Sequence, residues 1–132
     1  EQTGALFAGE TSGHFMFSSL GNYEMPLLVL YYVLKSLTYY GSYEDMIQRV
    51  YKYPKCPVTS ILVQDKQAVL TNIKESFKNE KQVEIDGISV YGEGFWFNVR
   101  SSNTENKIRY SVEADTQEKM NDIIQKLQQI IK

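Results

Sequence analysis

Two short polar stretches of the chain carry side chains that could do chemistry. The first is GETSGH, residues 9–14, which holds the only histidine. If the backbone is extended there, Glu10, Ser12 and His14 point to one side, because alternate side chains of a strand share a face. A carboxylate, a hydroxyl and an imidazole on one face would suit a polar small molecule. A lone histidine is also commonly a hydrogen-bonded structural residue, so this stretch alone does not define a function.

The second stretch is RSSNTENKIR, residues 100–109, which combines two arginines, three hydroxyl side chains and one acid, Glu105. If it is a hairpin folded about the Thr104–Glu105 bond, Arg100 lies opposite Arg109. Like charges directly across a ladder are destabilising, and a bound dianion between them would remove that penalty. Arginine presents a rigid fork that matches phosphate oxygens, and backbone N–H groups in such turns can bind anions. The alternative is a solvated hairpin loop with two exposed arginines.

Composition limits the classes of protein to which these stretches can belong. The chain has 132 residues, of which 42% are hydrophobic and 23% are charged, as in soluble globular proteins. This length predicts one domain, or one domain and a piece of another. The net charge of −2 argues against a general nucleic-acid surface. We therefore expect any anion site to be local.

The sequence also predicts where the protein is found. A single cysteine, Cys56, rules out an internal disulfide and suits a reducing cytosol. The longest apolar stretch, MPLLVLYYVL, is too short to span a bilayer, and no secretory signal is visible at the start. We expect a cytoplasmic protein without membrane or nucleic-acid partners. The chain begins without methionine and with an apolar run typical of a buried strand, so we expect a fragment of a longer protein.

The first half of the chain predicts an extended segment followed by two helices. Residues 4–17 are predicted to be extended, apart from the polar stretch. A helix is predicted over residues 22–40, with Pro26 in its first turn and Gly41 at its end. Ser42 is the predicted N-cap of a shorter helix that runs to about Tyr53.

The second half predicts short strands and two helices after a linker, YPKCP, whose two prolines exclude a helix. Alternating or β-branched runs predict strands, and apolar residues that recur every three or four positions predict helices. The predicted elements are a strand in VTSILV, a helix over residues 65–77, strands in QVEI, ISVYG, FWFNVR and KIRYSVEA, and a last helix capped by Asp115 and Glu118. The Asp86-Gly87 pair between two of these strands indicates a hairpin. The order β-α-β-β-β-β-α predicts an α+β fold, a mostly antiparallel sheet with two helices covering one face.

The two polar stretches, in this order and with a helix pair and a linker between them, resemble the bacterial α-D-phosphohexomutase superfamily, in its phosphomannomutase/phosphoglucomutase branch. In that family a G-E-x-S-G-H loop belongs to the third domain, and an R-x-S-N-T-E-P-x-x-R loop belongs to the fourth. The resemblance extends to DGISVY, FWFNVR and VEAD. It implies that residues 1–56 are the end of an α/β sugar-recognition domain with its linker. Residues 57–132 would be a phosphate-binding C-terminal domain of the TATA-binding-protein-like fold.

The resemblance also implies roles for single residues. Glu10 and Ser12 would bind sugar hydroxyls, and His14 would lie beside the substrate, with a catalytic role in proton transfer. The residues implied to hold the non-reacting phosphate are Arg100, Ser102, Asn103 and Thr104, with Ser101 contributing backbone and Arg109 closing the cluster. No metal ligand is implied in this chain. Three positions depart from the family pattern: Asn106 replaces proline, which predicts a less rigid loop, Ser101 replaces alanine or proline, and Thr11 replaces methionine.

The implied reaction interconverts a hexose 1-phosphate and a hexose 6-phosphate. It uses a phosphoserine enzyme, Mg²⁺ and a hexose 1,6-bisphosphate intermediate, and the serine and metal loops belong to the family's first two domains. We therefore expect the whole protein to be a phosphohexomutase, an isomerase that transfers phosphate within its substrate. This chain alone is expected to be inactive. The expected partners are a phosphorylated hexose and the missing N-terminal domains, with closure about the linker excluding water. The alternatives are phosphoglucosamine mutase, which more often has glycine at the position of Asn103, and a stand-alone, non-catalytic module that binds a phosphorylated ligand.

Overall fold

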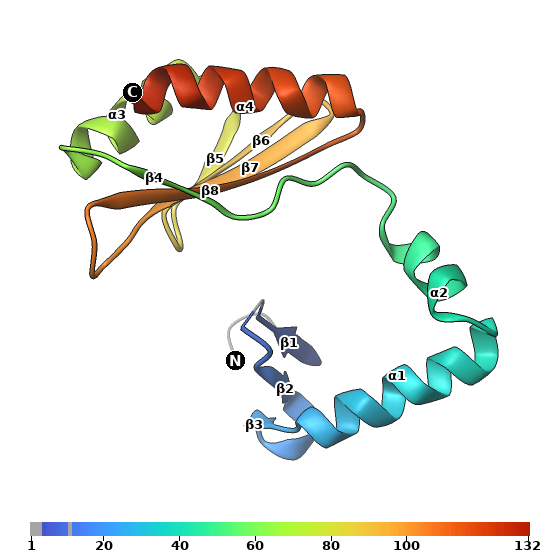
Figure 1. The fold of residues 1–132 in the computed structure, drawn as a ribbon. Helices are drawn as coiled ribbons and strands as arrows, with labels where there is room; N and C mark the ends of the chain where they lie inside the picture. The colour runs from blue at the N-terminus through green and yellow to red at the C-terminus, as the bar shows by residue number, and fades with distance from the viewer. Residues whose placement is uncertain (1–3, 11) are drawn as a thin grey trace. The chain divides into compact units, whose positions relative to one another are not determined.

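The computed structural model describes residues 4–10 and 12–132, and the chain divides into two compact units after Tyr51 (Figure 1). The first unit runs to Tyr51, and the second comprises Lys52–Lys132. We describe each unit by itself. Of the helices described, none combines the length and the apolar character that a membrane crossing requires.

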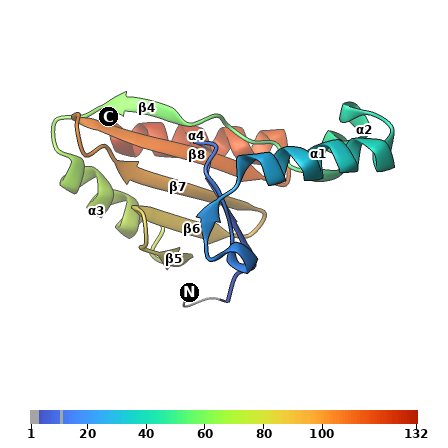
Figure 2. The ribbon, with the colours of Figure 1, turned by 90° about the horizontal axis from the view of Figure 1, so that it is seen from below.

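The second unit is a five-stranded antiparallel sheet with two helices on one face (Figures 1 and 2). Its elements are β4 (Thr59–Leu62), α3 (Lys66–Ser76), β5 (Lys81–Val83), β6 (Ile88–Gly92), β7 (Phe95–Ser101), β8 (Lys107–Ala114) and α4 (Gln117–Ile131). The strands lie in the order β4-β8-β7-β6-β5. The predicted order of elements and the predicted α+β, TATA-binding-protein-like class are therefore confirmed.

The hydrophobic core lies between this sheet and its two helices. Along β8, Ile108, Tyr110 and Val112 are at most 2% exposed, whereas the residues between them are only partly buried. This alternation follows from the two-residue period of a strand, which sends one set of side chains to the helices and the other to the open face. Polar residues of β7 and β8 can therefore gather on the open face of the sheet, opposite the helices.

The two helices begin at different kinds of cap. Asp65 caps α3, since its carboxylate accepts hydrogen bonds from the N–H groups of Gln67 and Ala68. The predicted cap of α4 at Asp115 is wrong: Thr116 is the N-cap, and its hydroxyl accepts from the Lys119 N–H. The reason is that the Asp115 N–H donates to the carbonyl of Gly94, which keeps Asp115 in extension of the sheet.

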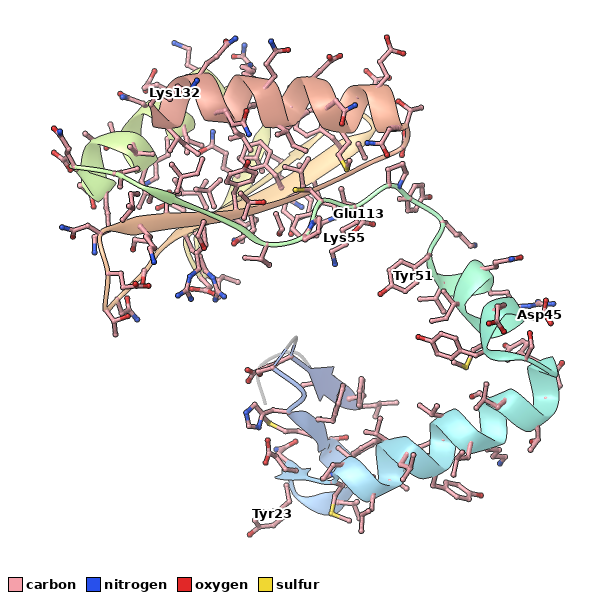
Figure 3. The ribbon with its side chains drawn as sticks, viewed as in Figure 1. Tyr23, Asp45, Tyr51, Lys55, Glu113 and Lys132 are labelled. Atoms are coloured by element: carbon pink, nitrogen blue, oxygen red, sulfur yellow. The ribbon has the colours of Figure 1, made fainter. Side chains whose placement is uncertain are left out.

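The segment predicted as a linker is partly bonded to the second unit. The Ala114 N–H donates to the carbonyl of Pro54, and the Cys56 N–H donates to the carbonyl of Val112. Lys55 and Glu113 therefore form an isolated antiparallel bridge, and Figure 3 shows them side by side. These bonds extend the edge of the sheet as far back as Pro54.

The first unit consists of a small antiparallel sheet and two helices. Its strands are β1 (Phe7–Gly9), β2 (Phe15–Phe17) and β3 (Tyr23–Glu24), in the order β1-β2-β3, with a 3-10 turn η1 (Ser18–Leu20) between the last two. The helices are α1 (Pro26–Tyr40) and α2 (Tyr43–Val50). As predicted, Gly41 ends the longer helix, and the Ser42 hydroxyl caps the shorter one by accepting from the Asp45 N–H.

Two predicted helix boundaries in this unit are wrong. The first helix begins at Pro26 and not at Asn22, because Asn22 has a left-handed φ of 63° and Glu24 pairs with Met16 in the sheet. Proline also disfavours helical backbone in the residue before it. The second helix ends at Val50, three residues before Tyr53.

None of the residues of α1 is buried, although the helix is mostly apolar. Leu27 is 77% exposed, and Leu30 and Leu34 are each more than half exposed. The buried residues of the described chain all belong to the second unit. The first unit therefore has no closed core of its own within this chain.

Candidate functional site

The hairpin of β7 and β8 brings the two arginines of the second polar stretch together. In the ladder Arg100 lies opposite Arg109, and Ser101 lies opposite Ile108. This is the register predicted from equal distances to the Thr104–Glu105 bond. The Ser102 N–H donates to the carbonyl of Lys107 at 2.9 Å and closes the loop at its base.

A hollow of about 430 Å³ lies over this pair. The residues that line it are Ile85, Asp86, Gly87, Arg100, Ser101, Ser102, Asn103, Thr104 and Arg109. The hollow thus gathers all six of the residues that the family resemblance implied to bind phosphate. Guanidinium groups, hydroxyls and an amide around one space supply hydrogen-bond donors with positive charge, which is what a phosphate dianion requires.

Carboxylates beside the hollow neutralise part of the positive charge of its arginines. Arg100 Nη1 donates to Asp86 Oδ2 at 2.7 Å, whereas Arg109 Nη2 lies 3.9 Å from Glu105 Oε2, too far for a hydrogen bond. Lys107 Nζ donates to Glu105 Oε1 at 2.7 Å, and this hydrogen bond and charge lower the pKa of Glu105. Arg109 is therefore the more weakly paired arginine of the two.

The turn between β5 and β6 is fastened against β7 beside Arg100. Gly87 has a φ of 74°, and a Cβ built there would lie 2.2 Å from the carbonyl oxygen of Val99, so only glycine fits. The Asn98 amide donates to the carbonyl of Asp86 at 2.9 Å. The sequence indicated a hairpin here, but no local pattern placed Asp86 at the site. Its contact with Arg100 depends on the pairing of β6 with β7.

Two residues outside the hairpin also form hydrogen bonds with its loop. Lys66 Nζ donates to the carbonyl oxygens of Ser102 and Glu105 at 2.9 and 3.2 Å. The Val63 N–H donates to the carbonyl of Asn106 at 3.0 Å. Asn106, which stands where the resembling family has proline, is therefore tied to the segment before α3. Neither contact could be predicted from a local pattern, because Val63 and Lys66 lie about 40 residues before the loop in the sequence.

The first polar stretch joins β1 and β2 through a tight turn, as an interruption of the extended chain. The condition of extended backbone, under which Glu10, Ser12 and His14 would share one face, is therefore not met. The Gly13 N–H donates to the Glu10 carbonyl, and the Glu10 N–H donates to the His14 carbonyl, each at 3.0 Å. Gly13 allows the turn through its φ of 90°. Thr11, one of the departures from the family pattern, lies outside the described residues.

The turn still gathers polar side chains, by a different geometry from the one predicted. The Ser12 hydroxyl donates to Glu10 Oε2 at 2.8 Å. His14 Nδ1 pairs with a carboxylate oxygen of Glu24, whose residue lies on β3. Both members of this pair are about half exposed. Sequence reasoning missed Glu24, because it lay in a segment predicted to be helical.

The two groups of candidate residues belong to different units. Glu10, Ser12 and His14 lie in the first unit, and the six residues of the hollow lie in the second. Within the part of the chain that the structure describes, no three His, Cys, Asp or Glu side chains lie close enough together to hold a metal ion.

The second unit matches a known protein family. Residues 59–130 match the family described as "Phosphoglucomutase/phosphomannomutase, C-terminal domain". The matched range contains the complete hollow, the helix α3 and all but the last residue of α4.

The sequence similarity to known proteins covers both units of the chain. A phosphomannomutase from Methanocaldococcus jannaschii is 40% identical over 128 residues, which cover 96% of this chain and 28% of that protein. A protein named probable phosphoglucosamine mutase, from Thermococcus gammatolerans, is 26% identical over 98% of this chain and 30% of its own length. The chain thus spans less than a third of the length of these relatives. Both organisms are archaea, so these relatives do not support the bacterial part of the resemblance.

A solved structure shows the same fold. The phosphoglucomutase/phosphomannomutase family protein from Burkholderia thailandensis has a TM-score of 0.76 to this chain. The match covers 98% of this chain and 28% of the solved one at 21% identity. At this level of identity the match concerns the fold alone.

Proposed function

The chain belongs to the phosphoglucomutase/phosphomannomutase family, and we propose that it is the substrate-recognition part of an enzyme that interconverts hexose 1-phosphates and hexose 6-phosphates. Residues 57–132 are proposed to bind the phosphate that does not react, and residues 1–56 to bind the sugar. Mannose and glucose phosphates are the proposed substrates. The observation that carries the proposal is the pairing of Arg100 with Arg109 beneath a hollow lined by hydroxyl and amide groups.

A phosphate dianion fits the hollow for an electrostatic reason. Like charges opposite each other in a ladder cost stability, and an anion between Arg100 and Arg109 converts this repulsion into two attractions. Each guanidinium can give phosphate oxygens two parallel hydrogen bonds. Ser102, Asn103 and Thr104 add neutral donors on the loop side. The bound phosphate is thereby held by its charge and shape and not by the sugar that carries it.

The polar turn of the first unit is the proposed sugar-binding group. Glu10 can accept from two neighbouring hydroxyls, and Ser12, which already donates to it, holds the carboxylate in place. The Nδ1 of His14 is engaged by Glu24, which leaves Nε2 as the nitrogen that can face a substrate. We propose that this nitrogen assists proton transfer to or from a sugar hydroxyl.

The phosphoserine and the Mg²⁺ of the proposed reaction are assigned to a part of a longer polypeptide that this chain does not contain. Mg²⁺ would there neutralise charge on the transferred phosphate. The hollow binds and orients hexose 1,6-bisphosphate and the two monophosphates. The chain alone is therefore expected to be inactive, as recognition without a phosphate donor leaves nothing to transfer.

A second candidate, phosphoglucosamine mutase, is supported by the names of several relatives. Four relatives from Thermococcus and Pyrococcus species, 24–28% identical to the chain, are named probable phosphoglucosamine mutase. The relative named phosphomannomutase is 40% identical, and for this reason we place mannose and glucose phosphates first.

An amide-resolved NMR titration with glucose 1,6-bisphosphate tests the proposal, with inorganic sulfate as the comparison. We expect saturable shifts concentrated in residues 100–109 at ligand concentrations where sulfate causes little change. Shifts of Glu10, Ser12 and His14 would support the proposed sugar contacts. Because sulfate has the charge and shape of a phosphate dianion, an equal response of residues 9–14 to sulfate would contradict the proposed sugar contacts. No shift in residues 100–109 at millimolar ligand would contradict the proposed function. Parallel titrations with mannose 6-phosphate and glucosamine 6-phosphate compare the two candidate substrates.

A further inference from the structure

Lys66, the first residue of α3, contacts the loop between β7 and β8, residues 102–106, but it does not line the hollow. Its ammonium donates to the carbonyl oxygens of Ser102 and Glu105 at 2.9 and 3.2 Å. These carbonyls stand at the two sides of the loop, and they lie 36 and 39 residues from Lys66 in the sequence. A single side chain that does not line the hollow therefore fixes two peptide groups of the loop.

The direction of these carbonyls determines the direction of the neighbouring amides. In a trans peptide the C=O and the following N–H point in opposite directions, and the described part of the chain has no cis peptide. Because the carbonyls of Ser102 and Glu105 point at Lys66, the N–H groups of Asn103 and Asn106 point away from it.

The loop amides are also free of partners within the described chain. The Ser102 N–H is bonded to Lys107, but none of the next four N–H groups donates to another described backbone or side-chain acceptor. These four groups belong to Asn103, Thr104, Glu105 and Asn106. Unpaired N–H groups in a turn can bind an anion, and of these four residues Asn103 and Thr104 line the hollow.

We propose that Lys66 is a positioning residue for phosphate binding: it orders the loop so that its free N–H groups serve as donors to the anion. This proposal rests on the proposed function, since it concerns the same hollow. Lys66 does not touch the ligand. Its contribution is to hold the peptide planes before the ligand arrives, which lowers the ordering cost of binding.

Three variants of the chain test this role. Lys66→Met keeps an unbranched side chain and a good helix former but removes the ammonium, whereas Lys66→Arg keeps a cationic donor. Lys78→Met is the matched control, because it removes one exposed lysine whose ionic partner is Glu75. The probe is inorganic phosphate, titrated at constant ionic strength and followed by amide shifts of the loop. Unchanged amide shifts in β7 and β8 establish that each variant keeps its fold.

We expect Lys66→Met to weaken phosphate binding at least about tenfold, with Lys78→Met within about twofold of the parent chain and Lys66→Arg restoring most of the loss. Without ligand, the amide order parameters of residues 103–106 should fall from about 0.85 towards 0.6 or below in Lys66→Met. A merely structural lysine would not lower the order of these amides selectively. Equal phosphate affinity in Lys66→Met and Lys78→Met, or an unchanged loop order, would overturn the proposal.

The two proposals fail in different ways. If the parent chain binds phosphate and Lys66→Met binds it equally well, the Lys66 proposal is wrong and the proposed function stands. If the parent chain does not bind phosphate at residues 100–109, the proposed function is contradicted. The order parameters, which need no ligand, then decide whether Lys66 orders the loop.

Discussion

At the scale of single residues, Arg100 and Arg109 are a pair that costs stability unless an anion lies between them. Asp86 offsets part of the charge of Arg100, but Arg109 has only a distant carboxylate, 3.9 Å away. A solvated loop gains nothing from such a pair. A phosphate site gains two charge-assisted contacts from it.

This difference predicts opposite effects for Arg109→Gln. Removing one like charge across the ladder should leave the second unit as stable as before, or more stable by about 0.2–1 kcal/mol. Phosphate affinity should fall about tenfold or more, because hydrogen bonds to charged groups contribute about 1.5–3 kcal/mol. Thermal unfolding and phosphate titration measure the two effects. Lys81→Gln, on the same sheet but outside the hollow, is the control, and loss of stability with unchanged affinity would show that Arg109 is structural.

Glu105 gives a pH-dependent test of the same loop. The hydrogen bond and charge of Lys107 lower its pKa, with a smaller contribution from Arg109. A carboxyl group whose pKa is lower in the folded chain stabilises the fold above its unfolded pKa, and this effect is lost as the pH falls through the folded pKa. We expect Lys107→Met to move the NMR titration of the Glu105 carboxyl carbon to higher pH. An unchanged titration midpoint would mean that the contact with Lys107 does not persist in solution.

At the scale of elements, the turn between β5 and β6 lines one side of the hollow. Gly87 allows this turn to pack closely against the backbone of β7. Gly87→Ala should destabilise the second unit by about 2 kcal/mol or more, because the methyl group meets the backbone of Val99 and the φ is left-handed. Gly94→Ala is the control: its φ is 73°, but the nearest atoms are ends of the Asp115 and Lys119 side chains, which can move. We expect it to cost about half as much or less. Equal losses in chemical denaturation would show that φ alone, and not close packing against β7, makes glycine necessary.

How much of the site could be predicted is also decided by the elements. The pairing of Arg100 opposite Arg109 could be predicted, because the register of a hairpin depends only on the distances of its residues from the turn. The contacts of Asp86, Lys66 and Glu24 could not be predicted. Each of these residues meets its partner only when segments that are distant in the sequence pack or pair as strands. The backbone at residues 9–14 could be given only as a condition, for a local reason: alternation of polar residues suits a strand and a glycine-containing turn equally well.

At the scale of the whole molecule, the proposed function would divide recognition between the two units, which carry different chemistries. The second unit has a buried core and places charge and N–H donors on a rigid hairpin, which suits a phosphate of fixed geometry. The first unit presents a carboxylate, a hydroxyl and an imidazole on a turn, which suits hydroxyl groups. Its apolar helix α1 has no buried residue in this chain.

The absence of buried residues from the described part of the first unit predicts unequal stability along the chain. Local opening costs little where few apolar contacts must break, whereas core strands open only with their whole unit. We expect hydrogen exchange to be at least about a hundredfold slower for amides of β7 and β8 than for amides of α1, because a stability difference of about 2.7 kcal/mol corresponds to that factor. The comparison is made on the 132-residue chain at a pH where intrinsic exchange is slow. Comparable protection of α1 would mean that its apolar residues are already covered, and that the first unit is stable without further chain.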